Sequence, residues 1–376
     1  MQISHMRRAI GALAMGVMAV ASVATAQDTS PQAPGPGVDE IRNAEFERRS
    51  AAGDLAAAAL GAVGTEGVVW VGYTVAAVRA DSGMCCFEQN DDGEHVCGVC
   101  RLGKRGSYTG RQHDDHDDGV ALEDDKEVRV LARFEDGQLG RIRTFSASCE
   151  IDAGGARVVW LTDVDTAASV QWLARVVDES TSARQHPKHL VEGALSSLAM
   201  HAGNAAFTRL EDWATGRHPR KLREQAIFWL GAGRGEEAWP TLVNLVTESP
   251  EPVIRERAVF AAYVSEQPGT IDLLVGVARG DDTSHVRRAA LMWLAQLAGD
   301  RAVAAIKDAL DDPDTEIKRH AVFALSQLPV DRGVPLLIEI VRENPNPQVR
   351  KQALFWLGQT GDERALALIE ELLLGN

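Results

Sequence analysis

The chain has 376 residues, with 54 Asp and Glu against 39 Lys and Arg, and its formal net charge is −15. This acidic balance disfavours nucleic acid as a partner, because proteins that bind nucleic acid carry clustered positive charge. The length exceeds that of a typical compact domain, so more than one structural part is expected.

The first 26 residues have the pattern of a secretory signal peptide. Arg7 and Arg8 form a basic start, residues 9–23 are apolar, and Ala24-Thr25-Ala26 matches the small-residue cleavage pattern. The apolar run is too short for a comfortable membrane span. The sequence therefore predicts cleavage near Ala26, no membrane span, and a periplasmic or secreted protein.

Two segments follow, a spacer and a small domain. Residues 27–45 are predicted to be a flexible spacer, because the segment up to residue 40 holds three prolines and few apolar residues. Residues 46–180 are predicted to form an α+β domain of about four strands, with Asp136-Gly137 as a hairpin turn. The expected elements are a helix at 54–63, strands at 67–75, 127–134, 139–148 and 156–161, and a helix at 166–177.

A long polar excursion, residues 80–125, lies between the first predicted strand and the hairpin. It holds Cys85-Cys86 and Cys97-x-x-Cys100, and Cys149 ends the hairpin. In an exported chain, clustered cysteines most often form disulfides. All five cysteines are therefore disulfide candidates, with at least one bond expected among the first four, while the connectivity stays open.

A metal site is the competing interpretation of this excursion. Cys-x-x-Cys is half of a zinc-binding pattern, but the adjacent Cys85-Cys86 does not supply the second spaced pair. His113 and His116 lie among four aspartates and can hold zinc, copper or nickel, although such a run is more often a solvated acidic loop. No cofactor is expected from the disulfide interpretation, and Zn or Cu from the alternative.

Motifs of common catalytic centres are absent from the sequence. It has no Gly-x-Ser-x-Gly nucleophile turn, no His-Glu-x-x-His zinc motif, no phosphate-binding glycine loop and no Cys-x-x-Cys-His haem attachment. We therefore expect a protein that is not an enzyme.

The C-terminal half, residues 188–376, is periodic. The same pattern recurs around six alanines, spaced by 31 or 32 residues: Ala194, Ala226, Ala258, Ala290, Ala321 and Ala353. Each copy begins with an apolar residue followed in most copies by Arg or Lys, as in Val349-Arg350, and loops with proline beside acids or amides separate the copies. A fixed period of this length predicts about six stacked helix pairs, an α-solenoid, and the domain at 46–180 is expected to cap its first unit.

The loops and the helix starts together resemble the short bacterial form of HEAT repeats. The residues that carry the resemblance are Asp312-Pro-Asp-Thr-Glu-Ile-Lys318, Asn344-Pro-Asn-Pro-Gln-Val-Arg350 and the Ala-x-x-x-Leu-Gly that continues the first helix. The resemblance implies a polar ladder of loop acids or amides with basic residues. The pairs it implies are Asp281 with Arg287, Asp312 with Lys318, and Asn344 with Arg350.

One helix position is apolar where a polar residue is expected. Counting the apolar residue before the Arg as zero, positions 0, 4, 7 and 8 form the core, and position 6 lies at about 240° on the wheel, nearly opposite. Position 6 holds Phe228, Phe260, Met292, Phe323 and Phe355. Neighbouring positions supply Arg288, Arg319, His320, Lys351 and Gln352. By the resemblance, this helix lines the concave surface of the array.

Three interpretations of this apolar stripe stay open. The side chains pack on one another and on the next helix, they bind a peptide or helix of a partner, or the chain's own N-terminal segment covers them. We expect a non-enzymatic exported scaffold that binds a protein or peptide on the concave surface. The alternative is a metal-binding or enzymatic protein with its site in residues 85–118.

Overall fold

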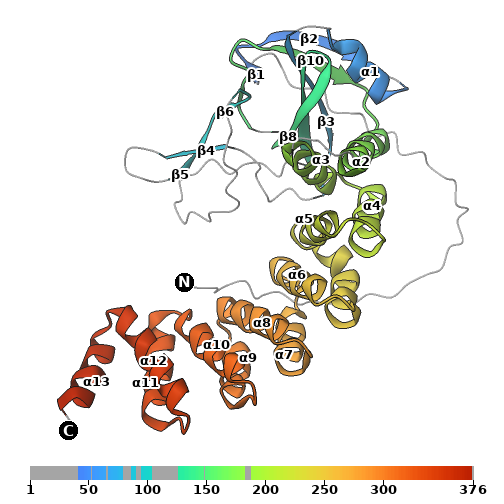
Figure 1. The fold of residues 1–376 in the computed structure, drawn as a ribbon. Helices are drawn as coiled ribbons and strands as arrows, with labels where there is room; N and C mark the ends of the chain where they lie inside the picture. The colour runs from blue at the N-terminus through green and yellow to red at the C-terminus, as the bar shows by residue number, and fades with distance from the viewer. Residues whose placement is uncertain are drawn as a thin grey trace, which may run out of the picture. The chain divides into compact units, whose positions relative to one another are not determined.

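The computed structural model describes residues 41–51, 53–64, 67–78, 86–89, 95–103, 126–147, 149–182 and 188–374. Of residues 86–89 and 95–98 it describes the backbone alone. The predicted architecture, a small α+β domain followed by an α-solenoid of about six helix pairs, is confirmed (Figure 1). The predicted signal peptide lies outside the described residues.

A five-stranded mixed sheet forms the centre of the α+β domain. Its strand order is β2-β10-β3-β7-β8, with β2, β10 and β3 parallel and the β3–β7 and β7–β8 pairs antiparallel. Asp136 and Gly137 join β7 to β8 with φ angles of 48° and 78°, as a two-residue hairpin turn requires. The strands are β2 (Glu45–Ser50), β3 (Val68–Ala76), β7 (Glu127–Glu135), β8 (Gln138–Ser146) and β10 (Arg157–Thr162).

Both faces of this sheet are covered. Alternate residues of β3 and β10, such as Val71 and Val159, face a core that continues into the helices. Their neighbours Trp70 and Trp160 face a second core, which includes the buried Ile41 and Ile151. The second core lies beneath a three-stranded sheet of order β1-β9-β6, formed by β1 (Ile41–Arg42), β9 (Ile151–Asp152) and β6 (Cys100–Arg101).

Two sequence predictions in this domain need correction. The spacer at 27–45 was predicted too long, because β1 lies inside it and Ile41 is buried. The excursion at 80–125 is not wholly irregular, because it contributes β6 and the hairpin of β4 (Cys86–Gln89) with β5 (His95–Gly98). β2 was also missed, because an edge strand rich in Arg and Glu lacks the apolar alternation that marks a strand.

Six helix pairs follow the domain, and we call the first helix of each pair the A helix and the second the B helix. The elements are α3 (Lys188–Met200), α4 (Asn204–Thr215), α5 (Arg220–Glu248), α6 (Pro252–Val264), α7 (Thr270–Gly280), α8 (Ser284–Leu297), α9 (Asp300–Asp308), α10 (Thr315–Ser326), α11 (Val330–Glu343), α12 (Pro347–Thr360) and α13 (Glu363–Leu374). α5 holds both helices of its pair, because Gly235 breaks it with φ 40° and ψ −108°. The short helix η2 (Ala309–Asp311) continues α9.

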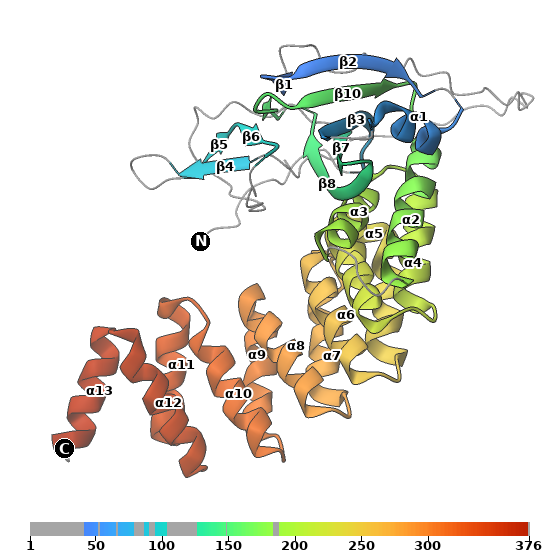
Figure 2. The same cartoon turned by 45° about the horizontal axis from the view of Figure 1, so that its top comes forward.

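The A helices form one layer of the array and the B helices the other (Figure 2). α5 packs on α6, α6 on α8, α8 on α10 and α10 on α12, while α7 packs on α9. The six recurring alanines are fully buried between these layers. Alanine therefore recurs at this position because the space between the two layers is too small for a larger side chain.

The sheet occupies the place of an A helix ahead of the first pair. α1 (Leu55–Ala62) and α2 (Thr166–Ser182) cover one face of the sheet, and α2 packs on α3 and α4 as a B helix would. On the A side, α3 packs directly on β8. A Cβ at Gly193 of α3 would lie 2.3 Å from the Ile142 carbonyl oxygen of β8, so only glycine allows this approach.

Candidate functional site

The predicted stripe lies on the exposed face of the A helices, which we call the A-helix face. Phe228, Phe260, Met292 and Phe323 are half-buried, and the side chain of Phe355 is 54% exposed. Each side chain thus leaves part of its apolar surface open to solvent. The structure places one of these residues on each of α5, α6, α8, α10 and α12.

Five rings form a continuous chain across three A helices. The Phe228 ring lies 5.2 Å from that of Trp229 and stacks at 5.9 Å on Phe260. Phe260 stacks at 4.7 Å on Trp293, and Trp293 stacks at 4.5 Å on Tyr263. These distances are centroid separations in the range that favours aromatic pairs. The rings therefore pack on one another and on the next helix, as the first interpretation expects, while binding of a partner and cover by the N-terminal segment stay predictions.

A second ring group covers the last two A helices. The Phe323 ring lies 5.3 Å from that of His320 and 5.2 Å from Trp356. Trp356 in turn lies 5.1 Å from Phe355. Burial lowers the pKa of His320, and the positive charge of Arg288 lowers it further, while Glu316 opposes the shift. His320 is therefore neutral near pH 7, and it extends the ring group as an uncharged ring.

Sequence reasoning missed the tryptophans of this face. Position 7 was assigned to the core, but Trp229, Trp293 and Trp356 are half-buried there and join the rings of position 6. Position 7 alternates between Trp and Ala, since Ala261 and Ala324 occupy it in the intervening pairs. The alternation of Trp and Ala at position 7 could have indicated this, because a small alanine on one A helix leaves room for the large tryptophan ring of the next A helix.

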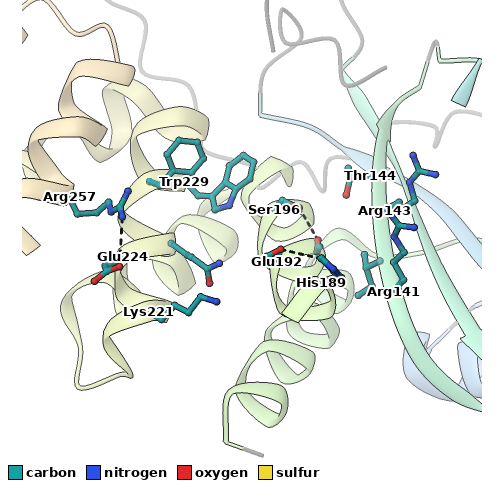
Figure 3. A pocket seen from close by; sticks show the side chains of 14 residues that line it. Arg141, Arg143, Thr144, His189, Glu192, Ser196, Lys221, Glu224, Trp229 and Arg257 are labelled. Atoms are coloured by element: carbon teal, nitrogen blue, oxygen red, sulfur yellow. Dashed lines mark hydrogen bonds and ion pairs between the residues drawn. The ribbon is translucent and has the colours of Figure 1, made fainter. Parts of the chain in front are cut away.

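A groove of about 610 Å³ opens where the sheet meets the A helices. Figure 3 shows its two sides, with Arg141, Arg143 and Thr144 on β8 and with Trp229 and Glu224 on α5. The lining residues are Arg141, Ile142, Arg143, Thr144, His189, Glu192, Gly193, Ser196, Lys221, Glu224, Gln225, Phe228, Trp229 and Arg257. The groove therefore continues the aromatic chain from Phe228 toward the edge strand β8.

Charges of both signs line this groove. Arg257 on α6 lies 3.8 Å from Glu224 on α5, and Glu224 also lies 3.3 Å from Arg220. His189 lies 3.6 Å from Glu192, one turn along α3 (Figure 3). The groove thus combines the apolar side chains of Ile142, Phe228 and Trp229 with charged groups of both signs.

The predicted polar ladder exists but joins different residues. Asp281 accepts hydrogen bonds from Arg255 at 2.8 and 3.0 Å, and Asp312 accepts one from Arg287 at 2.7 Å. The expected pairs of Asp281 with Arg287 and of Asp312 with Lys318 are therefore wrong. Each arginine reaches the acid of the following loop, so the ladder ties one helix pair to the next.

The reason lies in the loops themselves. The carboxylate of Asp281 also accepts from the backbone N–H of Thr283 at 2.8 Å, which turns the acid back toward the preceding pair. Where an arginine of the ladder contacts the loop before its own helix, it does so through a backbone carbonyl, not through the loop's acid or amide side chain. Arg350 donates to the Asn344 carbonyl at 2.7 Å, so this expected pair meets through the backbone rather than through the amide.

A buried serine on α2 and a buried histidine that follows α3 were not found from the sequence. Ser169 Oγ on α2 lies 2.7 Å from His201 Nε2 and 2.8 Å from the Tyr73 hydroxyl on β3. All three side chains are almost completely buried. A substrate cannot reach them, so this arrangement links the sheet to the array and is no catalytic pair.

The cysteines and the metal candidates are only partly described. Cys100 and Cys149 lie buried in the second core, and both are disulfide-bonded. Cys85, His113 and His116 lie outside the described residues, as do the side chains of Cys86 and Cys97. The connectivity and the metal alternative therefore stay predictions. Within the described part of the chain, no three His, Cys, Asp or Glu side chains gather in a way that would hold a metal ion.

No helix among the described residues has the length and apolar content needed to cross a membrane. A search of the curated proteins found no match to the chain.

Several solved structures are similar to the chain at low identity. The complex of CpcE and CpcF of phycocyanin lyase from Nostoc is 23% identical, with 40% of this chain and 98% of that chain covered and a TM-score of 0.32. Human deoxyhypusine hydroxylase is 17% identical, with coverages of 55% and 89% and a TM-score of 0.28. A designed armadillo repeat protein in complex with the peptide (KR)4 is 19% identical, with coverages of 50% and 98% and a TM-score of 0.31.

The family comparison addresses the array directly. The profile of HEAT repeats matches three overlapping stretches, residues 208–295, 239–326 and 303–376. These stretches cover the helix pairs from α4 onward, where the period, the paired helices and the loop-to-helix ladder also occur. The resemblance to HEAT repeats that the sequence indicated is therefore confirmed for residues 208–376.

Proposed function

We propose that the chain is an exported, non-enzymatic scaffold that holds a segment of a partner protein, or a peptide, on its A-helix face. The observation that carries the proposal is the continuous chain of five half-buried rings from Trp229 to Tyr263. Aromatic side chains that are ordered by packing and still partly open contribute most of the energy at protein interfaces.

The groove beside β8 supports the same proposal. It adds a groove lined by apolar and charged side chains to one end of the ring chain. The rings are held in place by one another, so a partner loses little side-chain entropy when it binds them. Export follows from the sequence pattern of residues 1–26, and the five cysteines suit an oxidising compartment.

The test replaces ring residues and measures capture of peptides. A peptide-display selection against the wild-type protein supplies binders, and their affinity is then compared between the wild type and variants. Phe260→Ser with Phe323→Ser, and separately Phe355→Ser, are expected to weaken binding by about tenfold or more, because each variant removes apolar contact area from the A-helix face. Leu366→Ser on α13 is the matched control, since Leu366 is 52% exposed and Phe355 is 54% exposed.

A urea melt of each variant separates binding from folding. Phe355→Ser should keep its free energy of unfolding within about 0.5 kcal/mol of the wild type, whereas the half-buried and stacked Phe260 should cost about 2 kcal/mol when truncated. Unchanged affinity in both ring variants would contradict the proposal. Mass spectrometry without reduction, with metal analysis of the same sample, tests the alternative, because five free thiols with one bound Zn or Cu would favour a site at 85–118.

A further inference from the structure

A row of charged residues runs beside the rings and changes sign along the array. The row consists of the third residue in each of the last five copies of the pattern, Glu224, Glu256, Arg288, Arg319 and Lys351. The first two members are acidic, and each has a basic side chain close by. Glu224 lies 3.8 Å from Arg257 and Glu256 lies 3.7 Å from His285, in each case on the following A helix.

The last three members are cations, and none of them forms an ion pair with a described carboxylate of a following helix. Arg288 faces His320 on α10, and its charge lowers the pKa of that imidazole. Arg319 lies 2.9 Å from Glu316 of its own helix, where both side chains are largely exposed. Among the described residues, neither Arg288 nor Lys351 has a carboxylate within ion-pair distance. Although the chain has a net charge of −15, three successive A helices, α8, α10 and α12, thus each present a cation on one face.

This charge pattern identifies the chemistry of a complementary partner. Resting on the proposed function, we propose that the A-helix face binds an extended acidic segment of a polypeptide. The segment carries a carboxylate on every third residue over α8, α10 and α12, and an apolar end on the rings of Phe228, Phe260 and Trp293.

The spacing follows from geometry. Packed helices lie about 8–10 Å apart, so the three cations repeat at about that distance along the face. A polypeptide in the polyproline II conformation has three residues per turn and advances about 3.1 Å per residue, so every third side chain points to the same side and lies about 9 Å from the last. A β-strand would instead turn the side chains at i and i+3 to opposite faces. Carboxylates at positions i, i+3 and i+6 therefore meet Arg288, Arg319 and Lys351 together, whereas three adjacent carboxylates reach one cation at a time.

The test uses two synthetic peptides of identical composition. Both carry the same apolar end with Leu and Phe, and one has Glu at i, i+3 and i+6 while the other has three adjacent Glu. Fluorescence anisotropy with the full chain is expected to show about tenfold tighter binding of the spaced peptide, and the preference should shrink at high salt. Equal affinity for the two peptides would overturn the proposed spacing.

Charge reversal locates the site. Arg288→Glu with Lys351→Glu should remove the preference for the spaced peptide. The matched control is Arg279→Glu with Arg301→Glu, which lowers the net charge equally on the exposed B helices α7 and α9. An equal loss in both double variants would show a general charge effect and contradict the proposal. A single-stranded oligonucleotide serves as a second probe. If it binds the wild type as tightly as the spaced peptide does, and if Arg288→Glu with Lys351→Glu removes its binding too, the face is a general polyanion surface and the proposal is wrong.

The two proposals fail separately in these measurements. If display-selected peptides lose affinity in the ring variants but glutamate spacing has no effect, the scaffold function stands and the acidic partner does not. If the ring variants leave every peptide unaffected, the scaffold function on this face falls as well.

Discussion

The Ser169 hydroxyl on α2 lies 2.7 Å from Nε2 of His201, the residue that follows α3. The other ring nitrogen of His201 lies 2.7 Å from the Ser197 carbonyl oxygen, so Nδ1 carries the proton and donates to it. Nε2 then accepts the Ser169 proton, and Ser169 accepts that of Tyr73. With His201 neutral, the Tyr73 hydroxyl, the Ser169 hydroxyl and both ring nitrogens of His201 all have hydrogen-bond partners. We call this series of hydrogen bonds, which runs from the sheet to the array, the line.

Replacing Ser169 by alanine should destabilise this connection. The substitution leaves the Tyr73 hydroxyl and His201 Nε2 buried without partners, which should cost about 2–3 kcal/mol of unfolding free energy in a urea melt. Ser196→Ala is the control, because the Ser196 hydroxyl is half-buried and, within the described part of the chain, bonds only the Gly193 carbonyl of its own helix. A loss below about 0.5 kcal/mol for Ser169→Ala would show that the line contributes nothing.

The same line predicts a dependence on pH. Burial lowers the pKa of His201 to about 4 from an ordinary value of 6.5, and the nearby charge of Arg234 also lowers it, while the hydrogen bond to Ser197 opposes the shift. The unfolded chain therefore binds a proton at a higher pH than the folded chain does. The contribution is complete above pH 6.5 and is lost as the pH falls toward 4, by about 3 kcal/mol in all.

Urea melts between pH 7.5 and 4.5 check this prediction, since the free energy of unfolding should fall across that window. Carboxylates elsewhere also titrate, so the comparison uses His201→Gln, whose side chain does not titrate. The variant should be less stable at pH 7 and should show a shallower slope. Parallel slopes for the two proteins would contradict the assignment.

Gly193 should be essential for the contact between α3 and β8. An alanine Cβ would lie 2.3 Å from the Ile142 carbonyl oxygen, and backbone on both sides must then move apart. Gly193→Ala is expected to lower the melting temperature and to cost more than about 2 kcal/mol. Gly276→Ala is the matched control, because its Cβ meets nothing within 4 Å and helix α7 should gain about 0.5–1 kcal/mol. Equal stability of both variants would show that the close approach is unimportant.

The inter-repeat ladder should matter most where it is buried. The side chains of Arg255 and Asp281 are only 9% and 7% exposed, so Asp281→Ala leaves a buried guanidinium with Asp282 as its remaining acid partner. We expect a loss of about 2–3 kcal/mol in a thermal or urea melt. The control is Asp308→Ala, whose pair with Arg279 is largely exposed and should contribute less than about 0.5 kcal/mol.

Much of the array could be predicted because its core is periodic. Ala258 and Ala321 recur at the interval of the helix pairs and are fully buried. Their spacing in the sequence therefore predicts where the helices of each pair pack on their neighbours. Position 6 was likewise predicted to face away from the core, and Phe355 does so. The hairpin of β7 and β8 followed from Asp136-Gly137, because few residue pairs accept two positive φ angles.

The sequence by itself determined the kind of repeat, the number of helix pairs and the position of the aromatic stripe, since each follows from spacing along one helix. Tertiary structure decided which arginine meets which aspartate, that Trp293 joins Phe260, and that Ser169 meets His201. These pairs lie 26 to 33 residues apart along the chain, and the distance between their atoms depends on how neighbouring helices pack. Helix periodicity fixes the direction of a side chain, but only packing fixes its partner.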